Sequence, residues 1–169
     1  MNRPRIYPNP ALRSKTCEVT NFDPAHINYV IKIMADSMKK YKAVGFAANQ
    51  FGILEKIVLA NVGKENIVVI NPEIIESRGE FTEDEGCISF PGVEITITRP
   101  NYVVVRGLDE NGESKIIEVG DLLARVLQHE IDHLNGILIV DKLSPTERLN
   151  FERLWKRGDY ERKNPSSVL

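Results

Sequence analysis

Between residues 53 and 119, apolar side chains recur with a period of two in short runs that Gly, Pro and Asn separate. This pattern is typical of strands and predicts a sheet in the middle of the chain. We expect the strands at residues 56–60, 67–70, 93–98, 102–106 and 115–119. The sequence Asp109-Glu110-Asn111-Gly112 between the last two runs is a hairpin signal, so at least that pair is predicted to be antiparallel.

Helical patterns lie on both sides of this region. Asp23-Pro24 is typical of a helix start, and apolar residues then recur at spacings of three and four, which predicts a helix over residues 24–42. A second helix is predicted over residues 122–134, with Asp121 as its N-cap and Asn135-Gly136 as a left-handed end. Ser144 opens a capping box that predicts a C-terminal helix over residues 144–158. Residues 159–169 are expected to form a frayed tail.

Together these elements predict one α+β domain over residues 1–169, with a core at residues 6–143. We expect antiparallel sheets packed around a central helix, flanked by an N-terminal helix and a C-terminal helix. A chain of 169 residues can bury a full core, and its 42% apolar and 27% charged residues exclude collagen-like and disordered classes.

Charge and cysteine content limit the partners of the protein. The formal net charge is −2 and no long run of Lys or Arg occurs, so we expect no direct binding of nucleic acid. No apolar run is long enough for a signal peptide or a membrane span, so neither membrane attachment nor a leader is expected. Two cysteines allow at most one disulfide, which favours a reducing, cytoplasmic location.

Inside the second predicted helix, His129-Glu130-Ile131-Asp132-His133 forms an HExxH pattern. At about 100° per residue, His129 and His133 lie roughly 40° apart on one helical face, so both imidazoles can reach one metal ion. Glu130 lies close enough to contact a metal-bound water, as a general base must. Shuffling this composition gives roughly 0.003 such patterns per chain, so a chance pair of ordinary histidines is the weaker interpretation.

A catalytic metal has three protein ligands and one open position, so a third ligand must come from elsewhere. No histidine follows His133, but Glu147 and Glu152 are candidates, as in a zinc peptidase. Cys87 is the better candidate, because it lies in a segment of glycines and proline that favours an irregular backbone, and a thiolate binds such metals more strongly. Taken alone, Cys87 is more often a buried core thiol, and Cys17 is interpreted as structural.

Residues 45–52 form a further segment of small side chains that contains Gln50. Small residues allow an extended peptide to lie against the backbone, and a glutamine amide can donate to a developing oxyanion. By itself the segment is more typical of a glycine-bounded turn with Gln50 exposed.

Three segments together resemble, in order and spacing, the signature motifs of the peptide deformylase family. They are Gly45-Phe46-Ala47-Ala48-Asn49-Gln50, Glu85-Gly86-Cys87-Ile88-Ser89 and Gln128-His129-Glu130-Ile131-Asp132-His133-Leu134-Asn135-Gly136. Residues 6–13 are similar to the first strand and turn of that family, so the resemblance covers residues 6–143.

The resemblance implies a metal-dependent hydrolase that removes the N-formyl group from the initiator methionine of nascent polypeptides and releases formate. One divalent metal ion is implied, with Cys87, His129 and His133 as its ligands. Fe²⁺ is the ion expected in the cell, and a site with these donors also accepts Zn²⁺, Ni²⁺ or Co²⁺.

The resemblance also implies roles for other residues of the site. Glu130 is the general base, and Gln50 with the backbone N–H of Ile88 forms the oxyanion hole. The residues expected to bind the substrate are Val44, Gly45, Gly86, Leu122, Arg125 and Val126. Behind the ligands we expect a supporting group of polar residues, for which the candidates are Glu85, Arg99 and Asp132.

The chain departs from the family pattern at several positions near the peptide-binding edge. Ala43 stands where a glycine is usual, and Phe46 where a leucine is usual. Arg125 and Glu83 replace residues that are commonly apolar around the methionine side chain. We expect Arg125 either to pair with Glu83 across the pocket mouth or to bend outward.

Two other function classes compete with deformylation: a zinc peptidase that uses a downstream glutamate, and a non-catalytic module that docks nascent chains or the ribosome. Cys87 discriminates against the peptidase, and Glu130 against the binding module, because a purely structural site needs no base. The expected partners are therefore an N-formylmethionyl nascent peptide and, less directly, the ribosome. We expect the protein to be a monomer.

Overall fold

The computed structural model describes residues 3–63 and 65–158. In this part of the chain the strands are β1 (Gly45–Ala47), β2 (Ile57–Ala60), β3 (Ile67–Arg78), β4 (Phe81–Gly86), β5 (Glu94–Arg99), β6 (Tyr102–Leu108) and β7 (Ser114–Gly120). Its α-helices are α1 (Pro24–Tyr41), α2 (Asp121–Leu134) and α3 (Pro145–Arg157). One sheet has the order β1-β2-β3-β6-β7, the other pairs β4 with β5, and all these pairings are antiparallel. The predicted α+β class is confirmed.

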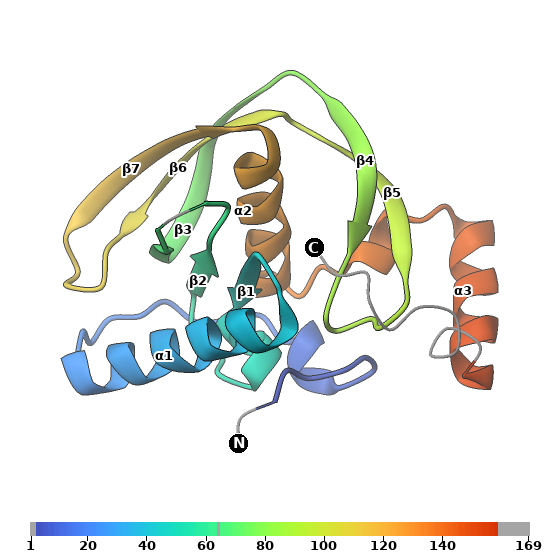
Figure 1. Ribbon diagram of the computed structural model, residues 1–169, viewed down its shortest axis with the longest axis horizontal. Helices are drawn as coiled ribbons and strands as arrows, with labels where there is room; N and C mark the ends of the chain where they lie inside the picture. The colour runs from blue at the N-terminus through green and yellow to red at the C-terminus, as the bar shows by residue number, and fades with distance from the viewer. Residues whose placement is uncertain (1–2, 64, 159–169) are drawn as a thin grey trace.

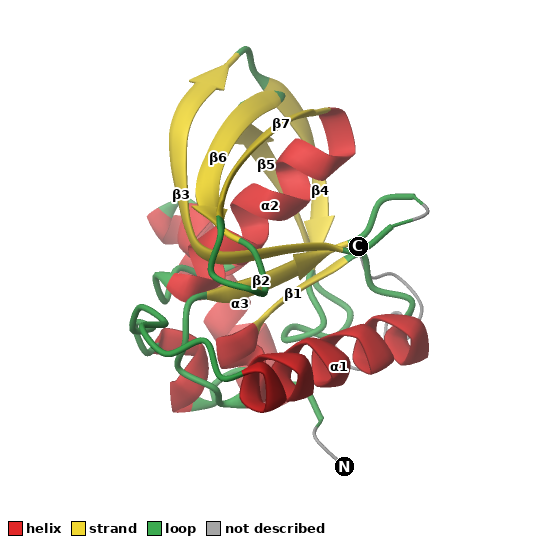
Figure 2. Cartoon of the chain, turned by 90° about the vertical axis from the view of Figure 1, so that its left-hand side faces the viewer, coloured by secondary structure: helices red, strands yellow, loops and turns green. Residues whose placement is uncertain are grey.

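Helix α2 lies between the two sheets. In Figure 1, β3 rises on one side of α2 and continues through a turn into β4, which descends on the other side, so the helix lies beneath an arch. Figure 2 shows α2 against the concave face of the larger sheet, with α1 below it. Leu127 and Ile131 of α2 pack with Val58, Val69 and Val105 of the sheet in one buried cluster. Burial of this apolar face fixes which side of α2 is free to face the second sheet.

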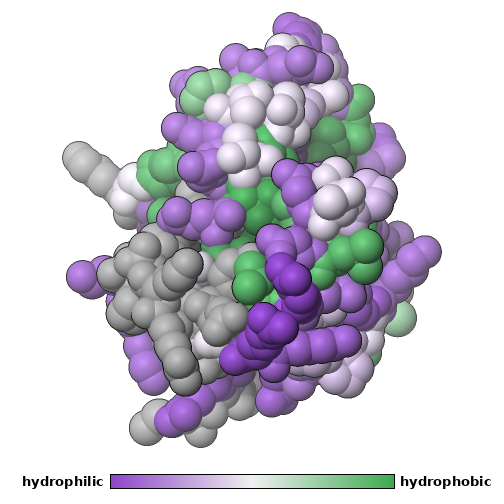
Figure 3. All heavy atoms as spheres, turned by 90° about the vertical axis from the view of Figure 1, so that its right-hand side faces the viewer, coloured by the Kyte–Doolittle hydropathy of each residue, from purple (hydrophilic) through white to green (hydrophobic). Residues whose placement is uncertain are grey.

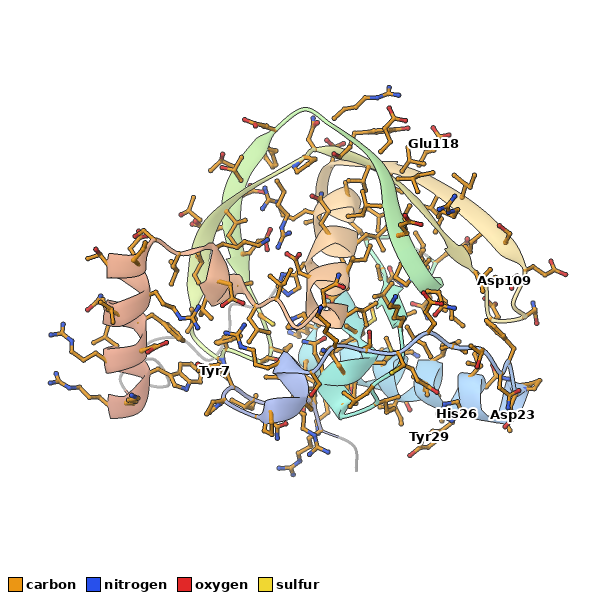
Figure 4. All side chains as sticks on the ribbon, turned by 180° about the vertical axis from the view of Figure 1, so that it is seen from behind. Tyr7, Asp23, His26, Tyr29, Asp109 and Glu118 are labelled. Atoms are coloured by element: carbon orange, nitrogen blue, oxygen red, sulfur yellow. The ribbon has the colours of Figure 1, made fainter. Side chains whose placement is uncertain are left out.

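Helix α1 supports the sheet from below. Its stripe of Ile27, Val30, Met34 and Met38 is buried, as the spacing predicts, and packs in one cluster with Phe46 and Leu59 among others. The opposite side faces solvent, where His26 and Tyr29 project outward (Figure 4). The stripe is therefore core.

Strand β3 continues well beyond the end that its sequence predicts. Asn71-Pro72 suggested a break after residue 70, but the strand runs to Arg78 through two register shifts against β6. Asn71 adopts a φ of 51°, and its side chain bonds the N–H and the C=O of Val19. A bulge held by this side chain accommodates Pro72 without ending the strand.

Strand β4 was not predicted, because four of its six residues are exposed and polar or aromatic, without a buried stripe. Register against β5 creates the strand, with Phe81 opposite Arg99 and Gly86 opposite Glu94. This pairing delivers Cys87 directly after the last residue of β4.

The first residues of the chain connect two of the sequence motifs. The N–H of Arg5 donates to the carbonyl of Gln50 at 2.6 Å, and the N–H of Tyr7 donates to the carbonyl of Ser89 at 2.9 Å. The ring of Tyr7, which points toward α3 in Figure 4, stacks on Phe90 with a centroid separation of 5.0 Å. The N-terminal segment therefore holds the residue 50 and residue 89 loops side by side.

The beginning of α2 differs from its prediction. Gly120 is the N-cap, and Asp121 is the first helical residue, with a φ of 52° and no capping bond from its side chain. The sharp turn from β7 places the cap one residue earlier than the apolar pattern indicates. The predicted left-handed end is confirmed at Gly136, whose φ is 71°.

Helix α3 begins with the predicted capping box at Ser144. Between α3 and β5 lies a cavity of about 320 Å³. Figure 3 shows this face of the molecule, where hydrophobic side chains gather between hydrophilic ones. The predicted tail at residues 159–169 lies outside the described residues. Within residues 3–63 and 65–158, no helix is long and apolar enough to cross a membrane.

Asp141 joins the N-terminal turn to α3. Its carboxylate accepts hydrogen bonds from Arg13, from the N–H of Leu138 at 2.8 Å and from Arg148 at 2.6 Å. Burial raises the pKa of Asp141, but these bonds, with that to Arg13 the strongest, lower it to about 2 from the ordinary 3.8.

A depressed pKa gives a contribution to stability that is present above the unfolded value and is lost as pH falls through the folded value. We therefore expect Asp141→Asn to lower the free energy of unfolding by about 1 kcal/mol above pH 4, with solvent screening limiting the size. Below pH 2 the difference from wild type should vanish. Denaturant unfolding between pH 6 and pH 2 measures it, and parallel pH curves for the two proteins would contradict this assignment.

Candidate active site

Helix α2 carries the HExxH residues on its buried side. His129, Glu130 and His133 are all buried, and the two imidazole rings are 5.0 Å apart between centroids. The opposite side of α2 packs in the sheet core, so the helix cannot rotate without exposing apolar surface. Packing therefore fixes the direction of both imidazoles.

Cys87, from the end of β4, completes the cluster. One ligand atom from each of Cys87, His129 and His133 lies within 4.8 Å of the others, and all three residues are buried. The glutamates of the peptidase alternative are engaged elsewhere: Glu147 bonds Ser144 and Glu152 bonds Arg148, both on α3. Among the described residues, the group that can hold a metal is thus one thiol and two imidazoles.

The donor set fits a divalent transition metal. Nδ1 of His129 is 3.1 Å from Oε2 of Glu85, which leaves Nε2 of His129 for a metal. Nε2 of His133 lies 3.3 Å from Sγ of Cys87. Burial lowers the pKa of His133 well below its usual value, assisted by the nearby charges of His129 and Arg99, so its neutral, metal-binding form is favoured. One sulfur and two nitrogens suit Zn²⁺, Fe²⁺, Ni²⁺ or Co²⁺.

Glu130 is buried beside this cluster and is 4% exposed. Its Oε2 has no hydrogen-bond partner among the described residues. Burial raises the pKa of Glu130 to about 7, against the opposing charge of His129. A Cβ on Gly45 would approach Oε1 of Glu130 to 2.6 Å and Val126 to 2.7 Å, so only glycine fits opposite this carboxylate.

Gln50 is buried, and its amide has a fixed direction. Oε1 accepts from the N–H of Ala47 at 2.9 Å, so Nε2 must point the other way, toward Cys87 at 3.8 Å and Ser89 at 3.2 Å. The interpretation of Gln50 as an exposed turn residue is wrong. The part of Ser89 in holding this amide was not foreseen, although Ser89 lies within the second motif.

A narrow pocket opens beside the cluster, with a cavity volume of about 20 Å³, roughly the room for one water molecule. Its lining residues are Val44, Gly45, Phe46, Gln50, Gly86, Cys87, Ile88, Arg125, Val126, His129 and Glu130. Leu122, expected here, is not in the lining and is partly exposed. Phe46, noted in the sequence as a departure from the family pattern, does belong to the lining.

Arg125 does not behave as its sequence position suggested. Its Nη1 donates to Oε1 of Glu85 at 2.6 Å and to the carbonyl of Ile97 at 3.1 Å, and Nη2 donates to the carbonyl of Phe81 at 2.5 Å. The prediction that Arg125 pairs with Glu83 or bends outward was wrong. Glu83 is exposed, whereas buried Glu85 offers a stronger electrostatic partner in a medium of lower dielectric constant.

Glu85 is the centre of a buried ionic cluster. It is fully buried and contacts Arg99 through both oxygens, Arg125 through Oε1 and His129 through Oε2. Burial raises the pKa of Glu85, but its bonds to His129 and Arg99 outweigh burial and lower the pKa to about 2. Arg99 also donates to Asp132 at 2.8 Å. Glu85, Arg99 and Asp132 therefore lie directly behind His129.

Comparison with known proteins agrees with this geometry. The family model for polypeptide deformylases matches residues 4–149. The chain is 39% identical over 155 residues to the peptide deformylase of Thermodesulfovibrio yellowstonii, covering 89% of this chain and 93% of the relative. It is 47% identical over 131 residues to that of Thermoanaerobacter pseudethanolicus, covering 78% of this chain and 82% of the relative.

A crystal structure of a peptide deformylase from Legionella pneumophila superposes with a TM-score of 0.87 at 38% identity, covering 98% of this chain and 99% of that one. The matched region includes both sheets, α2 and all three motifs. The chain therefore belongs to the polypeptide deformylase family of metal-dependent hydrolases.

Proposed function

We propose that this pocket removes the formyl group from N-formylmethionyl nascent peptides, with Glu130 moving the protons. The observation that carries the proposal is a buried carboxylate oxygen without a hydrogen-bond partner among the described residues, placed beside a Cys/His/His cluster. A bound divalent ion would supply Lewis acidity, lowering the pKa of water and polarising a carbonyl. Cys87, His129 and His133 would hold that ion.

The residues of the chain divide the remaining work. Glu130 takes a proton from the attacking water as the new C–O bond forms at the formyl carbon. Nε2 of Gln50 and the N–H of Ile88 donate to the formyl oxygen as it gains charge. When the C–N bond breaks, Glu130 returns the proton to the leaving amine, so the products are formate and a free N-terminus.

Binding of the peptide is assigned to the pocket lining and its edge. Val44, Gly45, Gly86 and Val126 line the pocket and can lie against the first residue of the substrate. Leu122 and Arg125 are the other two residues that we propose bind the substrate. Arg125 lines the pocket, whereas Leu122 lies outside its lining. For the finer properties we propose Fe²⁺ as the cellular ion, a cytoplasmic monomer, and access to the substrate near the ribosome.

Formate release from a formyl-methionyl peptide by metal-replete protein tests the function. We expect activity that is lost on chelation and restored by Fe²⁺, Zn²⁺, Ni²⁺ or Co²⁺. Cys87→Ser should weaken metal binding strongly, because a thiolate ligand is lost. Unchanged metal affinity in Cys87→Ser, together with cleavage of unformylated peptides, would favour the peptidase alternative.

Gln50→Ala is expected to lower kcat by roughly 10²-fold, because its donor acts on charge that develops in the transition state. KM should change little. Steady-state kinetics measure both, with metal content as the check on integrity. Gln128→Ala is the matched control, since Gln128 is also buried but bonds the carbonyls of Pro100 and Ala124. An effect confined to KM would make Gln50 a binding residue instead.

A further inference from the structure

Arg125 is a buried cation in the wall of the substrate pocket. Its exposed fraction is 2%, and it lines the pocket together with Val44, Val126 and Ile88, which are apolar. Arginine has no uncharged state at ordinary pH, so its charge must be compensated inside the protein. Glu85 provides that compensation at 2.6 Å.

The guanidinium of Arg125 is held rigidly, but not all of its N–H groups have an acceptor in the described part of the chain. Its bonds to Glu85, Ile97 and Phe81 occupy three N–H groups, and the Phe81 ring lies 5.5 Å from its central carbon. A guanidinium has five N–H donors. Two N–H donors of Arg125 are therefore left without an acceptor among the described residues.

The neighbouring charged groups do not take up these donors. Glu85 already forms ion pairs with Arg99, Arg125 and His129. The carboxylate of Asp132 pairs with Arg99 and Lys142. Glu83 lies exposed in solvent. No nitrogen of Arg125 is among the fully buried atoms of the described residues that lack a partner, and Arg125 lines the pocket. Its remaining donors can therefore bond water or an acceptor on a molecule that enters the pocket.

We propose, building on the deformylase function above, that Arg125 is a specificity-determining residue that makes the pocket wall a hydrogen-bond donor. Formylated first residues with an acceptor in the outer half of the side chain are then favoured over purely apolar ones. A sulfoxide oxygen is a strong acceptor, a thioether a weak one, and a methylene none. Methionine sulfoxide, methionine and norleucine at the first position form a series of similar shape that isolates this property.

The test compares formyl-methionine sulfoxide, formyl-methionine and formyl-norleucine peptides of otherwise identical sequence. In the wild-type enzyme, we expect kcat/KM for the sulfoxide to equal or exceed that for norleucine. In Arg125→Leu, the sulfoxide-to-norleucine ratio should fall by about 10-fold, the size expected for losing a hydrogen bond from a charged donor. The change should appear in KM, since this contact is remote from the reacting carbonyl.

Ratios within one protein sample do not depend on its active fraction, so partial unfolding or metal loss in Arg125→Leu leaves the test valid. Arg106→Leu is the matched control, because Arg106 is exposed, pairs with Glu73 between β6 and β3, and does not line the pocket. It should keep the wild-type ratio. An unchanged ratio in Arg125→Leu would overturn the role of Arg125, whereas no formate from any of the three peptides would instead reject the deformylase function.

Discussion

Glu130→Gln is expected to retain a full complement of metal and to lose formate release by about 10²–10⁴-fold, the usual cost of removing a general base. Glutamine preserves the shape of the buried side chain between Gly45 and the Cys/His/His cluster, but it cannot accept a proton. The loss should therefore fall on kcat. Metal analysis and formate release on the same sample measure it.

Glu83→Gln provides the matched control for this substitution. Glu83 lies on β4 near the pocket but is exposed and does not line it. The same chemical change there should leave formate release within about 2-fold, as is usual for surface substitutions. If Glu130→Gln kept activity within a few-fold of wild type, another group would have to move the protons.

Glu85→Gln is expected to lower the free energy of unfolding by about 3–5 kcal/mol, because it leaves Arg125 buried without a carboxylate and removes one of the two carboxylates of Arg99. Arg99 keeps Asp132, but Arg125 loses its only carboxylate partner among the described residues. Glutamine keeps one uncharged oxygen, for which His129 would compete with Arg99 and Arg125, so metal affinity should fall by about 10–100-fold. Denaturant unfolding and metal competition measure the two effects separately.

An exposed ion pair offers the corresponding control. Glu73 and Arg106 are 2.6 Å apart, with more than half of each side chain exposed. Glu73→Gln should cost at most about 1 kcal/mol, because water screens this pair. Equal losses in Glu73→Gln and Glu85→Gln would show that burial does not set the strength of the Glu85 cluster.

The helices and the pairing of two histidines on one helical face could be predicted because their signals are local. The stripe of α1, the capping box of α3 and the spacing of His129 and His133 each depend on neighbouring residues. The length of β3 and the existence of β4 depend on partners distant in the sequence. Asn71 bonds Val19, and β4 is ordered by β5, so neither could be inferred from periodicity.

The residues of the site also divide into those with local sequence signals and those whose partners are distant in the sequence. Gln50 and Cys87 are recognisable within motifs, but the partner of Arg125 depends on which carboxylate the fold buries. Glu83 and Glu85 are two residues apart on β4, and the sequence does not show which of them is buried. Only Glu85, near the end of the strand, meets Arg99, Arg125 and His129 in the interior. The capping role of Gly120 was missed for a related reason, since the turn from β7 fixes it.

The bonds from Arg5 to Gln50 and from Tyr7 to Ser89 have a consequence for biosynthesis. Arg5 acquires its partner only after Gln50 has been made, and Tyr7 only after Ser89. The histidines of α2 are made later still. No fragment that ends before His133 contains the whole Cys/His/His cluster. A growing chain of this enzyme must therefore have been made at least as far as His133 before it can act on any formylated N-terminus, including that of another copy of itself.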